Sequence, residues 1–159
     1  MKIEIYRNKE YKNSYIGICE IPSKKRTIVV DGRPHSLEFP EMKFFIEISH
    51  VNDYFFQSLY ITNKDAYVLS LPHQTDEGLV CLEDGYSYCA SDSEINKLCE
   101  TVVNYFWRSQ FLYHFNDCSF GRSQFMNDMK SGIVTATKYK SWMASSGILQ
   151  RKYKLVRSH

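Results

Sequence analysis

The stretch Lys43-Phe44-Phe45-Ile46-Glu47-Ile48-Ser49 is the part of the sequence that best indicates the fold class. In an extended chain, successive side chains point to opposite faces. Phe44, Ile46 and Ile48 would therefore share one face of a strand, and the residues between them would share the other. Alternation over this length predicts a β-strand that lies against a hydrophobic core.

The same kind of pattern surrounds this stretch in the first half of the chain. Further strands are predicted over Lys2–Tyr6, Tyr15–Ile21, Thr27–Val30, Tyr54–Thr62 and Ala66–Leu71. Asp31-Gly32-Arg33-Pro34 is a turn signal between two of the predicted strands. The connections are too short for helical crossovers, so we expect an antiparallel meander.

The second half changes to a helical period. Ser91-Asp92-Ser93-Glu94 is typical of a helix start, and apolar residues recur after it at three- to four-residue spacing. We expect this helix to end near Phe115-Asn116-Asp117 and two more to follow, over Ser123–Lys130 and over Thr137–Ser145, the last ending near Gly147. The basic segment Arg151–Lys154 is expected to be mobile or peripheral.

The order of these elements predicts an α+β fold in a single domain over residues 1–159. Residues 1–71 would be mainly strands, 72–91 a functional loop, and 92–159 mainly helices. A long loop inside a small domain is more often functional than not.

The composition limits the classes of partner that the sequence predicts. Twenty Lys and Arg residues against eighteen Asp and Glu residues give a net charge of +2, which offers no reason to expect nucleic acid or an anionic membrane surface as a partner. The sequence has no long apolar run and no signal-peptide pattern, so we expect a cytoplasmic protein. Five cysteines without a CxxC pair are expected to be reduced thiols.

One of these thiols, Cys81, lies in the predicted loop, in the short apolar stretch Leu79-Val80-Cys81-Leu82. A thiol presented at the end of a loop is a candidate covalent carrier of acyl groups. The alternative is that Cys81 is a small hydrophobic residue buried at the edge of the core. Cys19 and Cys99 lie on predicted apolar faces and are expected to be core residues.

The segment around Cys81 resembles the active-site stretch of ubiquitin-conjugating enzymes, especially their divergent bacterial relatives. That family has a His-Pro-Asn tripeptide whose Asn lies eight residues before the catalytic cysteine. The matching positions here are Pro72 for the Pro, His73 for the Asn, Gly78 for a common Gly, Val80 for an aliphatic residue, and Cys81 and Leu82 for the nucleophile and its neighbour. The resemblance covers about Lys43 to Asp117 and includes the order of strands, loop and long helix.

The chain departs from the family pattern at two positions. Leu71 replaces the His of the tripeptide, and His73 replaces the Asn that stabilises the oxyanion in the family. An imidazole N–H can also donate to an oxyanion, so His73 is the candidate donor; the alternative is a structural histidine that pins the loop. Glu83, Asp84 and Asp117 are candidates to orient or deprotonate an attacking lysine, or are simply solvated residues.

The resemblance implies a function. Cys81 would carry a ubiquitin-like modifier protein as a thioester, received from an activating enzyme, and pass it to an amine on a target protein. Relatives of this type resemble components of bacterial anti-phage operons and mobile elements, and this resemblance implies that the modified target would be a signalling enzyme such as a nucleotide cyclase. The alternatives are a catalytically inactive scaffold of the same fold and a small cysteine hydrolase with a Cys81–His dyad.

No cofactor or metal is expected. A zinc site could be drawn from Cys81, Cys89, His114 and Cys118, but their spacing lacks the paired ligands of known zinc motifs.

Overall fold

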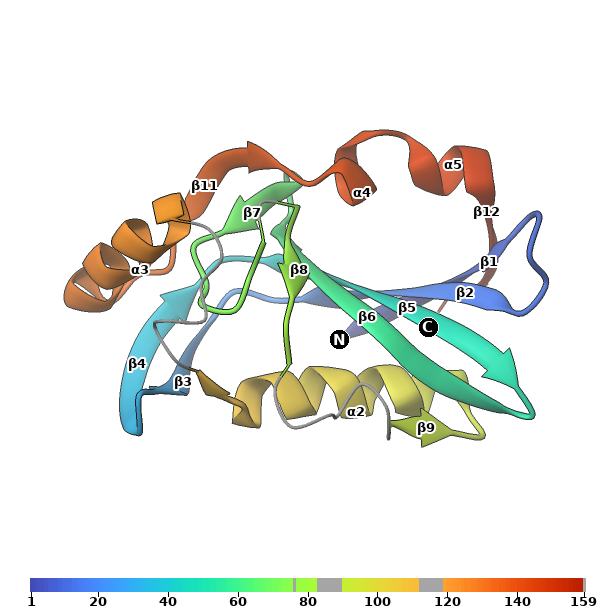
Figure 1. The fold of residues 1–159 in the computed structure, drawn as a ribbon, viewed down its shortest axis with the longest axis horizontal. Coiled ribbons are helices and arrows are strands. Elements are labelled where there is room, and N and C mark those ends of the chain that lie inside the picture. Colours follow the sequence, from blue (N-terminus) through green and yellow to red (C-terminus); the bar gives the residue numbers. More distant parts are fainter. Residues whose placement is uncertain (76, 83–89, 112–118, 159) are drawn as a thin grey trace.

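The structure, a computed structural model, describes residues 1–75, 77–82, 90–111 and 119–158 (Figure 1). It has an α+β fold with two sheets; the larger one is antiparallel, and the smaller one contains one antiparallel and one parallel strand pair. The strands of the larger sheet are β1 (Lys2–Asn8), β2 (Ser14–Ile21), β5 (Met42–Val51), β6 (Asp53–Asn63), β7 (Tyr67–Leu69), β8 (Leu79–Val80), β9 (Ser91–Asp92), β11 (Ala136–Lys140) and β12 (Tyr153–Ser158). The smaller sheet contains β3 (Lys24–Val30), β4 (Arg33–Phe39) and β10 (Gln110–Phe111).

The larger sheet has the strand order β11-β7-β6-β5-β2-β1-β12, and β8 and β9 also pair with β6. The predicted meander is confirmed for β1–β2 and β5–β6–β7, whose neighbours in sequence are antiparallel neighbours in space. It is interrupted after β2, which pairs with β5 instead of β3. The β3–β4 hairpin leaves the main sheet and forms the smaller one with β10.

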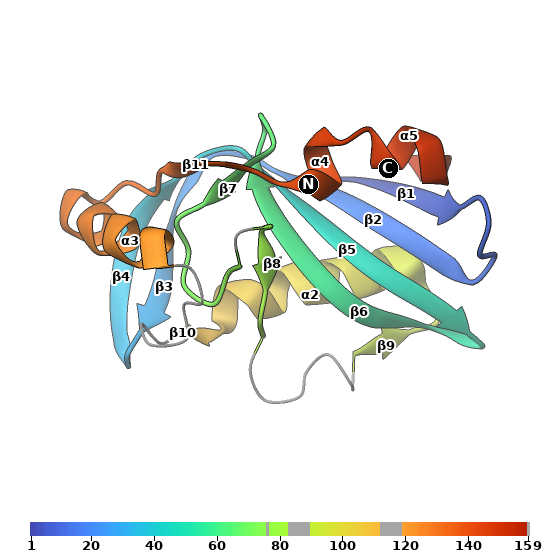
Figure 2. The same cartoon turned by 45° about the horizontal axis from the view of Figure 1, so that its top comes forward.

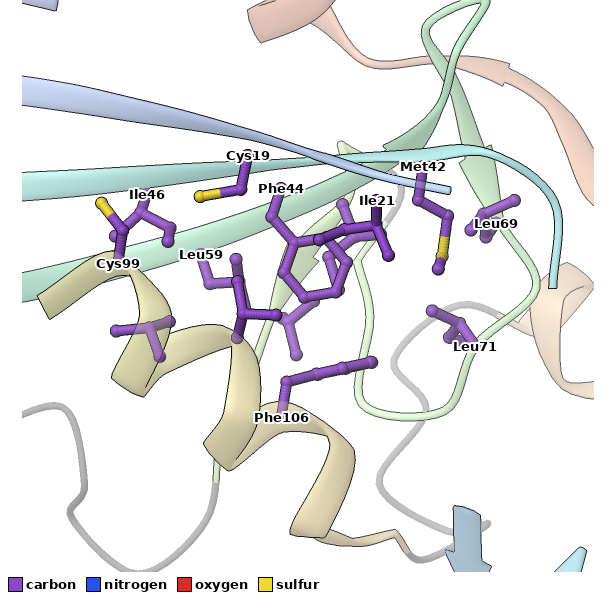
Figure 3. Close-up of a cluster of buried hydrophobic side chains, with 14 of the residues drawn as sticks. Cys19, Ile21, Met42, Phe44, Ile46, Leu59, Leu69, Leu71, Cys99 and Phe106 are labelled. Atoms are coloured by element: carbon purple, nitrogen blue, oxygen red, sulfur yellow. The ribbon is translucent and has the colours of Figure 1, made fainter. Parts of the chain in front are cut away.

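Helix α2 (Ile95–Arg108) covers one face of the larger sheet, and α4 (Trp142–Ser145) and α5 (Ile148–Lys152) lie over the opposite face (Figures 1 and 2). The predicted alternation in β5 is confirmed, and its second face also contributes to a core cluster, which was not predicted. Phe44, Ile46 and Ile48 join the large core cluster beneath α2, whereas Phe45 joins a smaller cluster on the other face. Figure 3 shows Phe44 directed from the sheet toward Phe106 of α2, whose ring centroids are 5.2 Å apart.

The long helix is shorter than predicted. Its apolar stripe is buried, but α2 ends at Arg108, because Ser109 is extended (φ −66°, ψ 148°) and Ser109 Oγ donates to Tyr105 O. The next residues form β10, which pairs in parallel with β3 and buries Phe111. Burial of this aromatic ring in the small sheet takes the place of further helical turns.

The C-terminal third differs most from expectation. The second predicted helix is confirmed as α3 (Ser119–Ser131). The helix predicted over Thr137–Ser145 is wrong in its first half, where β11 pairs with β7, and only the short α4 follows. Gly147, at φ +71°, separates α4 from α5.

Other strands were also not expected, among them the short β8 and β9 within the predicted loop, β12 and β4. The segment Arg151–Lys154 is peripheral, but it has regular structure that was not predicted: it is the end of α5 and the start of β12, an edge strand of the larger sheet that pairs with β1. The segment that follows Asp31-Gly32 forms β4. The turn is made by these two residues alone, and Arg33 and Pro34 already pair with Val30 and Val29 of β3.

Candidate functional site

The predicted loop 72–91 is tied to the main sheet in its middle, through β8, and at its C-terminal end, through β9. Leu79 and Val80 of β8 pair with Tyr60 and Leu59 of β6, and β9 pairs with the other end of the same strand. Gln74 forms an additional antiparallel bridge with Val80. The loop is therefore held by backbone hydrogen bonds up to the residue that precedes Cys81.

Gln74 connects the loop to β6 through its side chain. It is buried, and its Nε2 donates to Ile61 O at 2.8 Å and to Gly78 O at 3.0 Å. Buried amides with such partners order a loop, because a broken bond would leave polar groups without solvent.

Gly78 makes the closest approach to the sheet. Its φ is +91°, a conformation that favours glycine, and Ile61 N donates to Gly78 O at 3.0 Å. A Cβ atom at this position would lie 3.0 Å from Ile61 O. The turn before it is closed by Gly78 N donating to Thr75 O and by Thr75 N donating to Leu79 O. Only a glycine allows the loop to lie this close to β6 without strain.

Cys81 is exposed, and its backbone is fixed. Cys81 N donates to His73 O at 2.7 Å. Val80 before it is buried, and Leu82 after it is half-buried against the main core cluster. The two flanking side chains therefore anchor the backbone, and the thiol between them is directed to the surface.

Cys19 and Cys99 show the opposite environment. Both are fully buried, as predicted, and lie on β2 and α2 where these elements face each other (Figure 3). A hydrogen bond with the Cys99 thiol is the main cause that raises the pKa of the Cys19 thiol far above its ordinary value, and burial is the second cause. This thiol stays protonated and is a poor nucleophile. Of the three cysteines in the described part of the chain, only Cys81 is available at the surface.

His73 lies in the loop as a buried residue. It adopts a left-handed backbone conformation (φ +61°), is 3% exposed, and its ring contacts that of Phe111 edge to face with centroids 5.4 Å apart. Its carbonyl oxygen positions the amide of Cys81. The role that these contacts support is the pinning of the loop to β10.

Two contacts that the sequence did not suggest also hold the site. Trp142 Nε1 of α4 donates to Glu77 Oε2 of the loop at 3.2 Å. Before the loop, Ser70 Oγ donates to the buried carboxylate of Asp128 in α3, which also accepts from Thr135 N at 2.8 Å. These partners are far apart in sequence, so no local pattern could have revealed them.

Several candidate residues fall outside the part of the chain that the structure describes. These are Glu83, Asp84, Cys89, His114, Asp117 and Cys118. Among the described residues, no group of three or more His, Cys, Asp or Glu side chains is arranged to hold a metal ion. The described helices include none that is long and apolar enough to span a membrane.

The geometry combines one exposed thiol, a preceding strand bonded to the central sheet, and a buried histidine that fixes the thiol-bearing residue through its carbonyl. Such an arrangement can present a nucleophile to a large partner, because the thiol is at the surface and its backbone is rigid. Comparisons with protein families, with curated proteins and with solved structures find no match to this chain.

Proposed function

We propose that the protein carries a ubiquitin-like modifier on Cys81, as a divergent relative of the ubiquitin-conjugating enzymes. The observation that carries this proposal is the contrast among the described cysteines: Cys81 is exposed on a fixed backbone, while Cys19 and Cys99 are buried. A buried thiol cannot be reached by a partner protein, whereas a carrier must present its thiol to two protein partners in turn. The α+β order of strands, loop and long helix is compatible with this family.

The proposed reaction has two acyl transfers. The Cys81 thiolate attacks the thioester carbonyl that links the modifier to a cysteine of the activating enzyme; the C–S bond to Cys81 forms and the old one breaks, releasing the enzyme's thiolate. An amine of the target protein then attacks the new thioester, an amide forms, and the Cys81 thiolate leaves as the amine loses a proton. Thiolates are good nucleophiles and good leaving groups, so both steps have modest barriers.

The partners of this reaction are proposed with it: a ubiquitin-like modifier, an activating enzyme and a target protein in the cytoplasm. Bacterial antiviral defence, with a nucleotide cyclase as the target, is the setting that the resemblance around Cys81 suggests. The basis for this setting is the spacing of Pro72, His73, Gly78 and Cys81 in the sequence.

The first test is adduct formation. The protein is incubated with the candidate modifier, its activating enzyme and ATP, and the products are separated with and without reductant. We expect an adduct that reductant cleaves, that Cys81→Ala abolishes, and that Cys81→Lys converts to a reductant-resistant amide. Cys19→Ala is the matched control and should leave the adduct unchanged, because that thiol is buried. An adduct that survives Cys81→Ala would contradict the assignment of the nucleophile.

The second test concerns His73. If its imidazole donates to the oxyanion, His73→Ala leaves thioester loading intact and slows transfer to lysine by about ten- to a thousand-fold. The buried ring and its contact with Phe111 support the pinning role instead. With that role, we expect His73→Ala to reduce loading and transfer together and to lower the melting temperature, while His73→Asn, which tolerates the left-handed backbone, is milder. Loading and single-turnover discharge, measured separately, distinguish the two roles.

A non-catalytic scaffold is the second candidate function. The observation that favours it is that both Leu71 and His73, which occupy the His and Asn positions of the family tripeptide, are buried. A scaffold would form no covalent adduct with any modifier, and its binding to partners would be unchanged in Cys81→Ala.

A further inference from the structure

A small pocket is lined by residues of β1, β2, β6 and β12 and by the first residue of α2. The start of α2 lies at the end of the main sheet where Figure 1 shows β9 and the β5–β6 turn. The pocket has a volume of about 200 Å³, and its lining residues are Ile5, Arg7, Tyr15, Tyr54, Ile95, Val156 and Arg157. The lining shares no residue with the loop that bears Cys81. The pocket contains two cationic side chains and no carboxylate.

The two arginines come from neighbouring strands. Arg7 extends the face of β1 that carries Ile3 and Ile5, and Arg157 lies opposite Ile5 in the pairing of β12 with β1. Neither guanidinium makes a hydrogen bond or an ion pair to any residue that the structure describes. An isolated exposed arginine is usually solvated, but two of them on one pocket create a local excess of positive charge.

The carboxylates nearest in the strand pairing are engaged elsewhere. Glu4 belongs to the opposite face of β1, where it accepts from Tyr6 and pairs with Lys2 Nζ at 3.4 Å. Asp92 lies opposite Tyr54 in the β6–β9 pairing, and its Oδ1 accepts from Glu94 N at 2.9 Å at the start of α2. The charge of the two arginines is therefore not neutralised within the pocket.

Aromatic rings form another part of the wall. Tyr15 and Tyr54 meet edge to face with centroids 5.7 Å apart, and His50 stacks on Tyr54 at 4.2 Å. Neither tyrosine hydroxyl makes a hydrogen bond within the described structure. Ile5 and Ile95, both buried, contribute the apolar part of the lining. A planar ring can pack on such a surface while the polar groups contact an anion.

We propose that this pocket binds an aromatic phosphate monoester. A phosphate monoester carries close to two negative charges at neutral pH, which matches two guanidinium groups, and guanidinium binds phosphate oxygens in a fork geometry. A carboxylate ligand carries a single negative charge and would balance only one of the two guanidinium groups. The volume is below the range of pockets for drug-sized ligands, so the ligand part inside would be one ring and its phosphate.

The test is to measure the binding of phenyl phosphate to the full chain, either by calorimetry or by the changes in the NMR chemical shifts of the protein. We expect saturable binding with a dissociation constant of about 1 mM or tighter, and weaker binding of both inorganic phosphate and uncharged benzyl alcohol. Arg7→Gln and Arg157→Gln should each weaken phenyl phosphate about ten-fold or more, since each removes a charge-assisted contact. Tyr54→Leu should weaken phenyl phosphate but not inorganic phosphate.

The matched control is Arg33→Gln. Arg33 is an exposed arginine of β4, in the smaller sheet, and its substitution changes the net charge by the same amount. Binding should change less than about two-fold in this variant, because distant charges are screened by salt. Equal losses in Arg33→Gln and Arg7→Gln would show that only net charge matters and would overturn the proposal. Absence of saturation with phenyl phosphate in the unmodified protein would overturn it as well.

Two sources could present this chemistry: a free metabolite or the phosphotyrosine side chain of a protein. A phosphotyrosine capped at both ends distinguishes them. Tighter binding of the capped phosphotyrosine than of phenyl phosphate supports a site that reads modified proteins, and the reverse order supports a metabolite site. Whichever of the two ligands binds more tightly, we expect the difference between their affinities to be lost in Arg7→Gln. A difference that persists in that variant contradicts the assignment to this pocket.

Discussion

At the scale of single residues, the site depends on one backbone conformation more than on any side chain. Gly78 brings the loop within hydrogen-bonding distance of β6 at a positive φ, and Ile61 occupies the space beside it. The sequence indicates the glycine through its spacing from Cys81, but the partner strand is seventeen residues away, and only the fold shows why the position excludes other residues. The same is true of the buried amide of Gln74.

Gly78→Ala should therefore be destabilising for two reasons, backbone strain and the 3.0 Å approach of its Cβ to Ile61 O. We expect a loss of about 2–4 kcal/mol in the free energy of unfolding, measured by chemical denaturation. Gly32→Ala is the matched control, because Gly32 has a similar φ of +76° and no atom within 4 Å of the added Cβ. It should cost only the strain, about 1 kcal/mol. Equal losses in the two variants would contradict the close approach of the loop.

At the scale of elements, helix α2 and strand β2 fit each other closely. Cys99 of α2 lies over Gly17 of β2, and a Cβ added at Gly17 would lie 2.5 Å from Cys99 Sγ. The helical stripe that contains Cys99 follows directly from apolar spacing and was predictable. The end of α2 was not, because Phe111 is buried by pairing of β10 with a strand that lies far earlier in the chain.

A double-mutant cycle measures this fit. Gly17→Ala should lower the free energy of unfolding by about 1–3 kcal/mol, because it overfills the space between the sheet and the helix. In Gly17→Ala/Cys99→Ala the sulfur is gone, and we expect the two changes together to cost less than their sum by about 1 kcal/mol or more. Additive losses would mean that the two residues do not meet.

At the scale of the whole molecule, the sheet is completed by a segment whose sequence did not reveal a strand. Short alternating runs in the first half, such as Lys43–Ser49, can be recognised as strands from the sequence alone, since one face is apolar. β12 carries basic residues and exposes both Leu155 and Val156, so it lacks that alternation and gains its place only by pairing with β1. β11 likewise depends on β7. Local patterns predicted most strands with a buried face and missed β11 and β12, which are defined by a distant partner. They also missed β4, although Leu37 and Phe39 are buried, because its first residues resemble a turn.

Deletion of residues 153–159 tests the contribution of β12. The truncated chain loses the β1–β12 hydrogen bonds and the contact of Tyr153 with the smaller core cluster. We expect the free energy of unfolding to fall by about 2–4 kcal/mol, from several cross-strand contacts and hydrogen bonds of modest individual strength. The control, Leu155→Thr/Val156→Thr, keeps the strand and changes only half-exposed side chains, so its loss should stay near 1 kcal/mol or below. Equal stability of the truncated and full chains would show that β12 is dispensable.

The pairing of β1 with β12 also has a consequence for the route by which the chain folds. Lys9 Nζ donates to Gln150 O across a separation of 141 residues, and the paired residues of β1 and β12 are even further apart in sequence. Closing such a loop costs entropy before any contact compensates it, so pairings of this kind form late and raise the contact order. The amide hydrogens that join β1 to β12 would then be among the first in the sheet to exchange with solvent, through an opening that leaves β2, β5 and β6 folded.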